Sequence, residues 1–299
     1  MSDPRILYKL NERIISVRFS KQYLLGSRVL MYLDMLKNGR VRRLIERFHK
    51  DIKTVKLRNK SDSSQERILN IDFDKPVIGK RLVVYTSIYG KYDRIFEPLY
   101  VDPNCDYYIL TNQDIPKDSI WKKIDYEFPE SVNTDFLRNR YVKMFPYLIF
   151  PDYTYSLYID GNITLVSAVS LYLNDFNCKT GIGMHKHPAS NDLYDEVDAC
   201  HMTGKITADE AANLKQKLKT EGFPKNFGML ECNVILRNHQ VEACKDIMQI
   251  WWNELLTGVK RDQLHFTHAL YKLGYKYSDI DILGLNMNMN PMFIREAHL

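Results

Sequence analysis

Apolar runs with strand character alternate with helical segments from Arg81 onward, and this alternation constrains the fold more than any other feature. Buried strands appear as short apolar runs, whereas helices repeat apolar residues at three- and four-residue spacing. Strands that alternate with helices build an α/β sheet. The expected strands are 82–86, 105–111, 155–159, 181–185 and 229–236. One expected helix is capped by Thr134 or Asp135, and three others are expected at 207–220, 241–256 and 262–273.

The first 75 residues differ from the rest of the chain in charge. Residues 1–60 contain 16 Lys/Arg and 5 Asp/Glu, a net charge of +11, so the other 239 residues of this +5 chain carry −6. Leucine-rich positions between 24 and 36 recur at helical spacing, which indicates amphipathic helices. We predict a basic helical segment with a linker at 1–75 and an α/β body at 76–299. The basic helices suit an anionic membrane surface, and packing on the core with Lys and Arg outward explains them equally well.

Several classes of protein are disfavoured by what the sequence lacks. No stretch approaches the about 18–20 apolar residues of a membrane span, and the N-terminus has no signal-peptide core. Five scattered cysteines without a C-x-x-C pair indicate reduced thiols. The acidic body lacks the basic and aromatic pattern of nucleic-acid binding. We expect a cytoplasmic protein, at the inner face of the membrane if the basic segment binds lipid.

The strand 155–159 ends in Asp160-Gly161-Asn162, the most informative motif in the chain. A carboxylate at the carboxyl end of a buried strand lies where α/β proteins bind ligands. Mg²⁺ and Mn²⁺ prefer oxygen ligands, often one or two carboxylates with substrate phosphates. Asp160 supplies the charge and Asn162 a neutral oxygen. An ordinary Asp-Gly turn is the simpler interpretation of these three residues when they are taken alone.

Two other segments offer side chains for a nucleotide donor. After the first strand, Thr86, Tyr89 and Asp93 lie where an α/β unit holds its nucleotide, with Tyr89 suited to stacking on a base. Arg140 and Lys143 are three residues apart and share a helical face, so they can neutralise a diphosphate. A polar turn is the alternative interpretation of the segment after the first strand, and a solvated charged face is the alternative interpretation of the helix with Arg140 and Lys143. The expected donor-binding residues are Thr86, Tyr89, Asp93, Arg138, Arg140, Lys143 and Asp160.

Polar residues in the second half of the chain suit a sugar or acceptor. His185 and His187 are two apart and face one side if they lie on a strand. Glu231 and Asn233 alternate onto one face of an apolar strand, where buried polar groups need partners. Asp262 starts a helix, either as its cap or as a general base. We expect sugar or acceptor contacts from His185, His187, Asn233 and Gln263, and catalysis by Asp262 or Glu231.

Taken in order, these motifs resemble a family of glycosyltransferase-like proteins with plant and bacterial members, formerly known as a domain of unknown function. The resemblance covers about residues 80–274. It implies a GT-A-like fold, in which a single Rossmann-like domain has a mixed central sheet flanked by helices. The motifs are Thr-Ser-Ile-Tyr-Gly-Lys-Tyr-Asp, Arg-x-Arg-x-x-Lys, Tyr-Ser-Leu-Tyr-Ile-Asp-Gly-Asn, His-Lys-His-Pro, Tyr-Asp-Glu, Glu-x-Asn-Val-Ile-Leu-Arg and Arg-Asp-Gln-Leu.

The resemblance also implies a reaction. A sugar would move from a nucleotide diphosphate, UDP-linked, to a hydroxyl of a glycan or lipid-linked acceptor in polysaccharide biosynthesis. Mn²⁺ or Mg²⁺ would bind at Asp160 and Asn162, since Asp160 matches the metal-binding aspartate of GT-A enzymes. Asn162 stands where many of these enzymes carry Asp, which favours an alternative: a catalytically silent sugar- or nucleotide-binding domain. An inverting enzyme needs a general base, and a retaining enzyme does not.

Overall fold

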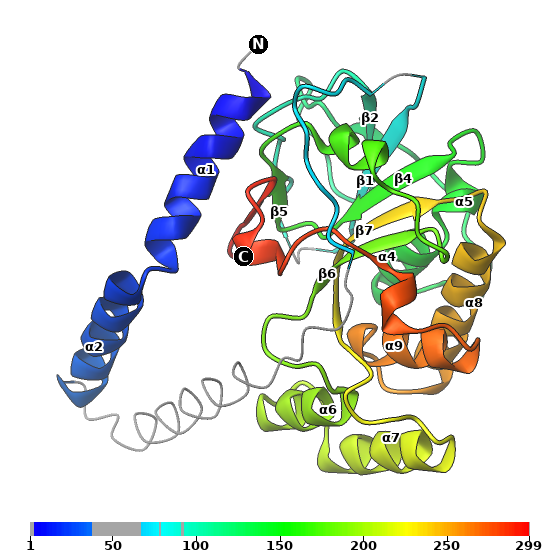
Figure 1. The fold of residues 1–299 in the computed structure, drawn as a ribbon. Coiled ribbons are helices and arrows are strands. Elements are labelled where there is room, and N and C mark those ends of the chain that lie inside the picture. Colours follow the sequence, from blue (N-terminus) through cyan, green and yellow to red (C-terminus); the bar gives the residue numbers. More distant parts are fainter. Residues whose placement is uncertain (1–2, 38–66, 78, 91–92, 299) are drawn as a thin grey trace.

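The computed structural model describes residues 3–37, 67–77, 79–90 and 93–298, and it confirms the α/β fold with a mixed sheet. Within these residues a seven-stranded sheet has the order β3-β2-β1-β4-β7-β6-β8 (Figure 1). Its strands are β1 Leu82–Ile88, β2 Cys105–Thr111, β3 Lys122–Lys123, β4 Tyr155–Ile159, β6 Ile182–Lys186, β7 Leu230–Asn238 and β8 Asp281–Ile282. A two-stranded sheet joins β5 Ile163–Leu165 to β9 Phe293–Arg295.

The direction of the strands brings distant polar segments to one edge of the sheet. Strand β1 pairs in parallel with β2 and β4, so these three strands end at the same edge. Strand β7 runs antiparallel to β4, and Val234 pairs with Ile159, the last residue of β4. Strand β7 therefore begins where β4 ends. Glu231 and Asn233 lie at this edge for that reason, beside Asp160.

Helices cover both faces of the sheet because its central strands are apolar on both sides. Alternate residues of β1 enter different cores, with Val83 and Tyr85 on one face and Leu82 and Val84 on the other. Burial on two faces is typical of parallel strands. The flanking helices are α4 Asp135–Met144, α5 Pro146–Ile149, α8 Glu242–Thr257 and α9 Gln263–Lys272 on the first face, with η1 Val169–Asn174 and η3 Met287–Met289 on the second.

Local sequence signals fix the ends of several helices as predicted. Thr134 caps α4 by accepting a hydrogen bond from the Leu137 amide at 3.2 Å. Thr207 and Glu210 form the predicted capping box of α7 Ala208–Thr220, which packs with α6 Leu193–Met202. Helix α4 ends at Met144, two residues before Pro146, because proline cannot continue the backbone ladder.

The N-terminal segment forms two helices, α1 Pro4–Arg18 and α2 Lys21–Lys37. Helix α1 packs beside the C-terminal segment, where Asn11 donates to the carbonyls of Pro291 at 2.9 Å and Phe293 at 3.1 Å (Figure 1). No described side chain of α2 is buried. Among the described helices, none combines the length and apolarity needed to cross a bilayer. The predicted basic stretch 40–60 and most of the linker 59–67 lie outside the described residues, and the boundary at 75 stays a prediction.

Candidate functional site

Asp160 lies directly after β4, at the edge where the parallel strands end. Its amide donates to the Asn233 carbonyl at 2.8 Å, and its own carbonyl accepts from the Ile163 amide at 3.0 Å. The backbone therefore forms the turn between strands that was the simpler interpretation. Gly161 is required there, because a Cβ atom would lie 2.7 Å from Ile88 Cγ1. The turn leaves the Asp160 carboxylate 35% exposed, so it is accessible to a ligand.

Four charged side chains gather beside this turn, and we call them the Lys143 cluster: Arg140, Lys143, Asp160 and Asp262. The Lys143 ammonium is almost wholly buried and lies 2.7 Å from Asp262 Oδ2 and 3.3 Å from Asp160 Oδ1. Arg140 Nε lies 3.4 Å from the same oxygen of Asp262. Arg140 and Lys143 thus share one face of α4, as predicted. Two cations offset two carboxylates, which makes the cluster electrically neutral.

The environment of Asp262 determines what its carboxylate can do. Burial alone would raise the pKa of Asp262, but Arg140 and Lys143 outweigh burial and hold it well below its ordinary value. The carboxylate does not cap α9, since no capping bond from its side chain exists. The simple capping interpretation is therefore wrong. A strongly acidic carboxyl group is a weak general base, so the geometry favours a role for Asp262 in positioning Lys143.

The C-terminal segment closes one side of the site, which the sequence did not indicate. The side-chain amide of Asn162 donates to the Glu296 carbonyl at 3.1 Å and lies 3.3 Å from His298 Nε2. Because an amide nitrogen only donates, Nε2 accepts and His298 Nδ1–H donates to Asp93 at 2.8 Å. Asp93 and Asn162, predicted separately, are thus brought together by a histidine that carries no motif and lies outside the predicted resemblance.

The oxygen atoms at this edge suit a cation that is held jointly with a diphosphate. Among the described residues no group of three or more His, Cys, Asp or Glu side chains has the geometry of a metal site. Asp160 offers one accessible carboxylate, whereas Asn162 is buried and its amide nitrogen is engaged by the C-terminal segment. Mg²⁺ commonly binds through one or two carboxylates plus substrate phosphates. The residues present therefore fit a cation that arrives with its nucleotide.

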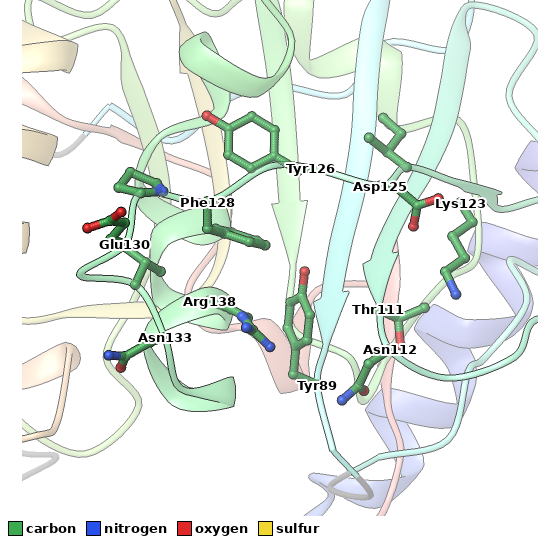
Figure 2. A pocket seen from close by; sticks show the side chains of 13 residues that line it. Tyr89, Thr111, Asn112, Lys123, Asp125, Tyr126, Phe128, Glu130, Asn133 and Arg138 are labelled. Atoms are coloured by element: carbon green, nitrogen blue, oxygen red, sulfur yellow. The ribbon is translucent and has the colours of Figure 1, made fainter.

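A cavity of about 450 Å³ lies at the carboxyl ends of β1 and β2, and Figure 2 shows its lining. Tyr89 stands between Phe128 and Arg138 on one side and Asn112 and Lys123 on the other. The ring of Tyr89 packs edge-on against Phe128, with 6.0 Å between centroids. This volume suits a small-molecule ligand. Arg138 lines the cavity, whereas Arg140 belongs to the Lys143 cluster, so α4 contributes to both parts of the site.

Ile88 and Tyr89 connect the cavity to the Asp160 turn. Ile88 is the last residue of β1, and its side chain packs on Gly161. The next residue, Tyr89, lines the cavity. Buried hydroxyl oxygens of Thr86 and Ser87 lack hydrogen-bond partners among the described residues. Buried polar atoms normally have partners, so these hydroxyls are consistent with a ligand at the end of β1.

The predicted sugar and acceptor residues separate into two groups. His185 is fully buried, and its Nε2 lies 2.8 Å from the Asn290 amide. Burial and a nearby Arg295 lower the pKa of His185 to about 3, so its ring stays neutral. An acceptor contact by His185 is not supported in this arrangement. His187 lies beyond Lys186, the last residue of β6, so strand alternation does not assign its ring to the side of His185.

The other residues of this set remain near the edge. His187 Nε2 lies 3.6 Å from Glu196 Oε2, and the amide nitrogen of Gln263 reaches Glu196 Oε1 at 3.4 Å. Asn233 Oδ1 is buried without a partner among the described residues. Glu231 accepts from the Met287 amide at 2.7 Å and pairs with Arg295 at 3.3 Å. Glu231 is therefore held as an anchor of the C-terminal segment, a poor arrangement for a free base.

A buried lysine between two carboxylates lies at the strand-end edge of an α/β sheet, where such proteins bind ligands. Residues 55–296 match the family described as TOD1/MUCI70, glycosyltransferase-like domain, and the chain belongs to this family. The predicted resemblance to a glycosyltransferase-like family is confirmed. The matched residues begin before and end after the predicted range of 80–274. Family membership implies a sugar donor and an acceptor in general terms.

A search of curated proteins found no match. Among solved structures, the chain is similar to the apo WbbM bifunctional glycosyltransferase, with 12% identity and a TM-score of 0.43 over 70% of this chain and 40% of that one. It is also similar to the glycosyltransferase GlyE of Streptococcus pneumoniae TIGR4, with 14% identity and a TM-score of 0.36 over 68% of this chain and 45% of that one. This chain spans less than half the length of either structure.

Proposed function

We propose that the protein is a hexosyltransferase that moves a sugar from a nucleotide diphosphate, UDP-linked, to a hydroxyl of a glycan or lipid-linked acceptor. The observation that carries this proposal is the Lys143 cluster beside the cavity lined by Tyr89 and Arg138. A nucleoside in the cavity would extend its diphosphate along the end of β1 toward Asp160. The family membership supports the same class of reaction.

Each part of the site has a role in this proposal. Tyr89 and Phe128 offer aromatic faces for the base, and Arg138 offers a cation at the rim of the cavity. Lys143 and Arg140 lie near the position where charge grows on the diphosphate as the sugar leaves, and such cations stabilise that charge. Asp262 keeps both cations in place.

The proposed cofactor is Mn²⁺ or Mg²⁺, bound by Asp160 and the carbonyl oxygen of Asn162 together with the donor. When bound, the cation would act as a Lewis acid on the leaving diphosphate. Its charge is needed because the Lys143 cluster is already neutral, whereas a diphosphate brings further negative charge. The low pKa of Asp262 and the anchored state of Glu231 speak against a strong side-chain base, which favours retention at the anomeric carbon.

We also propose that the protein acts in the cytoplasm, in polysaccharide biosynthesis. All five cysteines lie within the described residues and are unpaired, as expected in a reducing compartment. The acceptor would enter beside His187, Asn233 and Gln263, which are not among the residues that line the cavity.

A screen of nucleotide sugars by thermal shift, with and without Mn²⁺, tests the donor, because a ligand that binds only the folded state raises its stability. Hydrolysis or transfer of the selected sugar then tests the reaction. Asp160→Asn is expected to keep the fold and to abolish turnover. Asp198→Asn is the matched control, since Asp198 is an exposed carboxylate paired with Lys215 on another part of the surface. Full turnover by Asp160→Asn would refute the assignment.

A catalytically silent donor-binding domain is the second candidate, favoured by the engagement of the Asn162 amide with the C-terminal segment. This candidate and the enzyme make different predictions in the same assays. A silent domain gives a thermal shift with a nucleotide sugar but neither hydrolysis nor transfer with any acceptor. Release of free sugar from the donor would eliminate it.

A further inference from the structure

Helix α1 has two faces with different surroundings. One face packs on the body: Asn11 bonds to the C-terminal segment, Tyr8 packs edge-on against Phe73, and the Pro4 carbonyl accepts from Ser167. The other face carries large aliphatic side chains that are about half exposed. They are Ile6 at 57%, Leu10 at 49%, Ile14 at 52% and Val17 at 60%, and we call them the α1 stripe.

The α1 stripe is one continuous band. Its members follow each other at intervals of four, four and three residues, so they align along one side of the helix. Isolated exposed apolar residues are common, but a continuous band marks an interaction surface. Helix α2 continues the pattern, with Tyr23, Leu30 and Leu33 exposed. Packing on the core therefore accounts for only one side of α1.

Exposed cations border the α1 stripe on one side. Lys9 and Arg13 lie one turn from Ile6, Leu10 and Val17 along this border, and both are exposed. Arg18 instead shares the face of Asn11, and both line a pocket with the C-terminal segment. Glu12, the acidic residue within α1, is four residues from Tyr8 and so lies toward the packed side. The exposed side is thus apolar at its centre and basic along one border.

We propose that the α1 stripe docks on a lipid bilayer with anionic headgroups, with the helix lying in the plane of the interface. Aliphatic side chains would enter the acyl boundary, while Lys9 and Arg13 extend to the headgroups. A second copy of this chain fits less well, because symmetric pairing would bring the same basic border of both copies together. The 4-4-3 spacing also departs from the alternating seam of a coiled coil.

Docking would have a consequence for the site if the proposed transferase reaction is correct. Asn11 ties α1 to the carbonyls of Pro291 and Phe293, and the same segment delivers Arg295 and His298 to the edge that carries Asp160. A bilayer bound to α1 would then lie near the acceptor side. This arrangement suits a lipid-linked acceptor, whereas the docking itself does not depend on any sugar chemistry.

Vesicle flotation of the full chain, without nucleotide or sugar, tests the docking. The protein is expected to float with phosphatidylglycerol-containing vesicles, to float less at high salt, and to float poorly with phosphatidylcholine alone. Leu10→Gln/Ile14→Gln should reduce partition by about tenfold or more without changing thermal stability. The matched control is Leu99→Gln/Met202→Gln, which alters two exposed apolar residues elsewhere and should float like the unmodified protein.

Three results would overturn the proposal. The first is that the unmodified protein does not float. The second is that both double variants float as well as the unmodified protein, which would assign binding to another part of the chain. The third is a dimer in sedimentation velocity that Leu10→Gln/Ile14→Gln converts to a monomer, since the stripe would then belong to a second copy. Loss of flotation together with retained sugar transfer would support docking and separate it from the proposed reaction.

Discussion

Replacing Lys143 with methionine removes the ammonium group that links Asp262 to Asp160 while keeping much of the side-chain volume. The Asp262 carboxylate is buried and has Lys143 at 2.7 Å and Arg140 at 3.4 Å. Removing one partner of a buried ion pair costs about 3–5 kcal/mol, because the remaining charge stays buried without full compensation. Because Arg140 remains in contact with Asp262 and Asp160 is partly exposed, we expect the free energy of unfolding to fall by about 3 kcal/mol.

Urea and thermal unfolding measure this loss. A domain of this size loses about 2–4 °C in Tm for each kcal/mol, so the melting temperature of Lys143→Met should fall by roughly 6–12 °C. Lys245→Met is the matched control, since Lys245 pairs with Glu242 at the surface and such pairs contribute at most about 1 kcal/mol. The two variants differ in burial, because Lys143 and Asp262 are buried whereas Lys245 and Glu242 lie at the surface.

A second substitution distinguishes a stranded charge from a simple packing defect. Lys143→Met/Asp262→Asn also removes the Asp262 carboxylate that lost its lysine partner. We expect this double variant to recover about half or more of the stability that Lys143→Met loses. Strict additivity of the two single changes would show that the residues are not coupled. That result, or a loss no larger than that of Lys245→Met, would refute the described role of Lys143.

The remaining predictions concern the turn and the pH dependence of stability. Gly161→Ala should destabilise the protein by about 1–3 kcal/mol and weaken donor binding, since its Cβ would meet Ile88 Cγ1 at 2.7 Å. Ile88→Ala in the same chain should restore part of the donor binding but not the stability, because it removes a buried side chain. Urea unfolding should reveal stability that is complete above about pH 6.5 and falls by about 1.4 kcal/mol per pH unit for each buried histidine as pH drops toward 4. The reason is that burial lowers the pKa of His185 to about 3 and of His239 to about 4, so the unfolded chain binds these protons first. His239→Gln should make this slope shallower, and an unchanged slope would contradict the assignment.

Much of the fold could be predicted because its signals are local. The runs 105–111 and 155–159 became β2 and β4 without a shift, since apolar segments between turn residues suit only buried strands here. Thr134 and Thr207 marked helix starts because capping depends on a few neighbouring residues. The shared face of Arg140 and Lys143 followed from helical geometry alone.

The rest of the site depends on contacts between residues far apart in the sequence, which residue spacing does not predict. His298 reaches Asp93 across 205 positions, and Glu296 reaches Asn162 across 134, so no local pattern connects them. His185 was expected to share a strand face with His187, but β6 ends at Lys186, so strand alternation does not extend to His187. The sequence also left two interpretations of the N-terminal helices open. Helix α1 packs on the body by one face, and the exposed apolar residues on its other face leave membrane binding a proposal.

The C-terminal segment that borders the site determines when in synthesis the site can be completed. Strand β9 pairs with β5, so Arg295 meets Ile163 only after more than a hundred intervening residues have been made. Chains emerge and fold from the N-terminus first, and contacts between distant residues form late. The sheet and the Lys143 cluster can therefore assemble while the Asp160 turn still lacks its outer wall. The pairing of β9 with β5 would then add the outer wall after most of the sheet has formed.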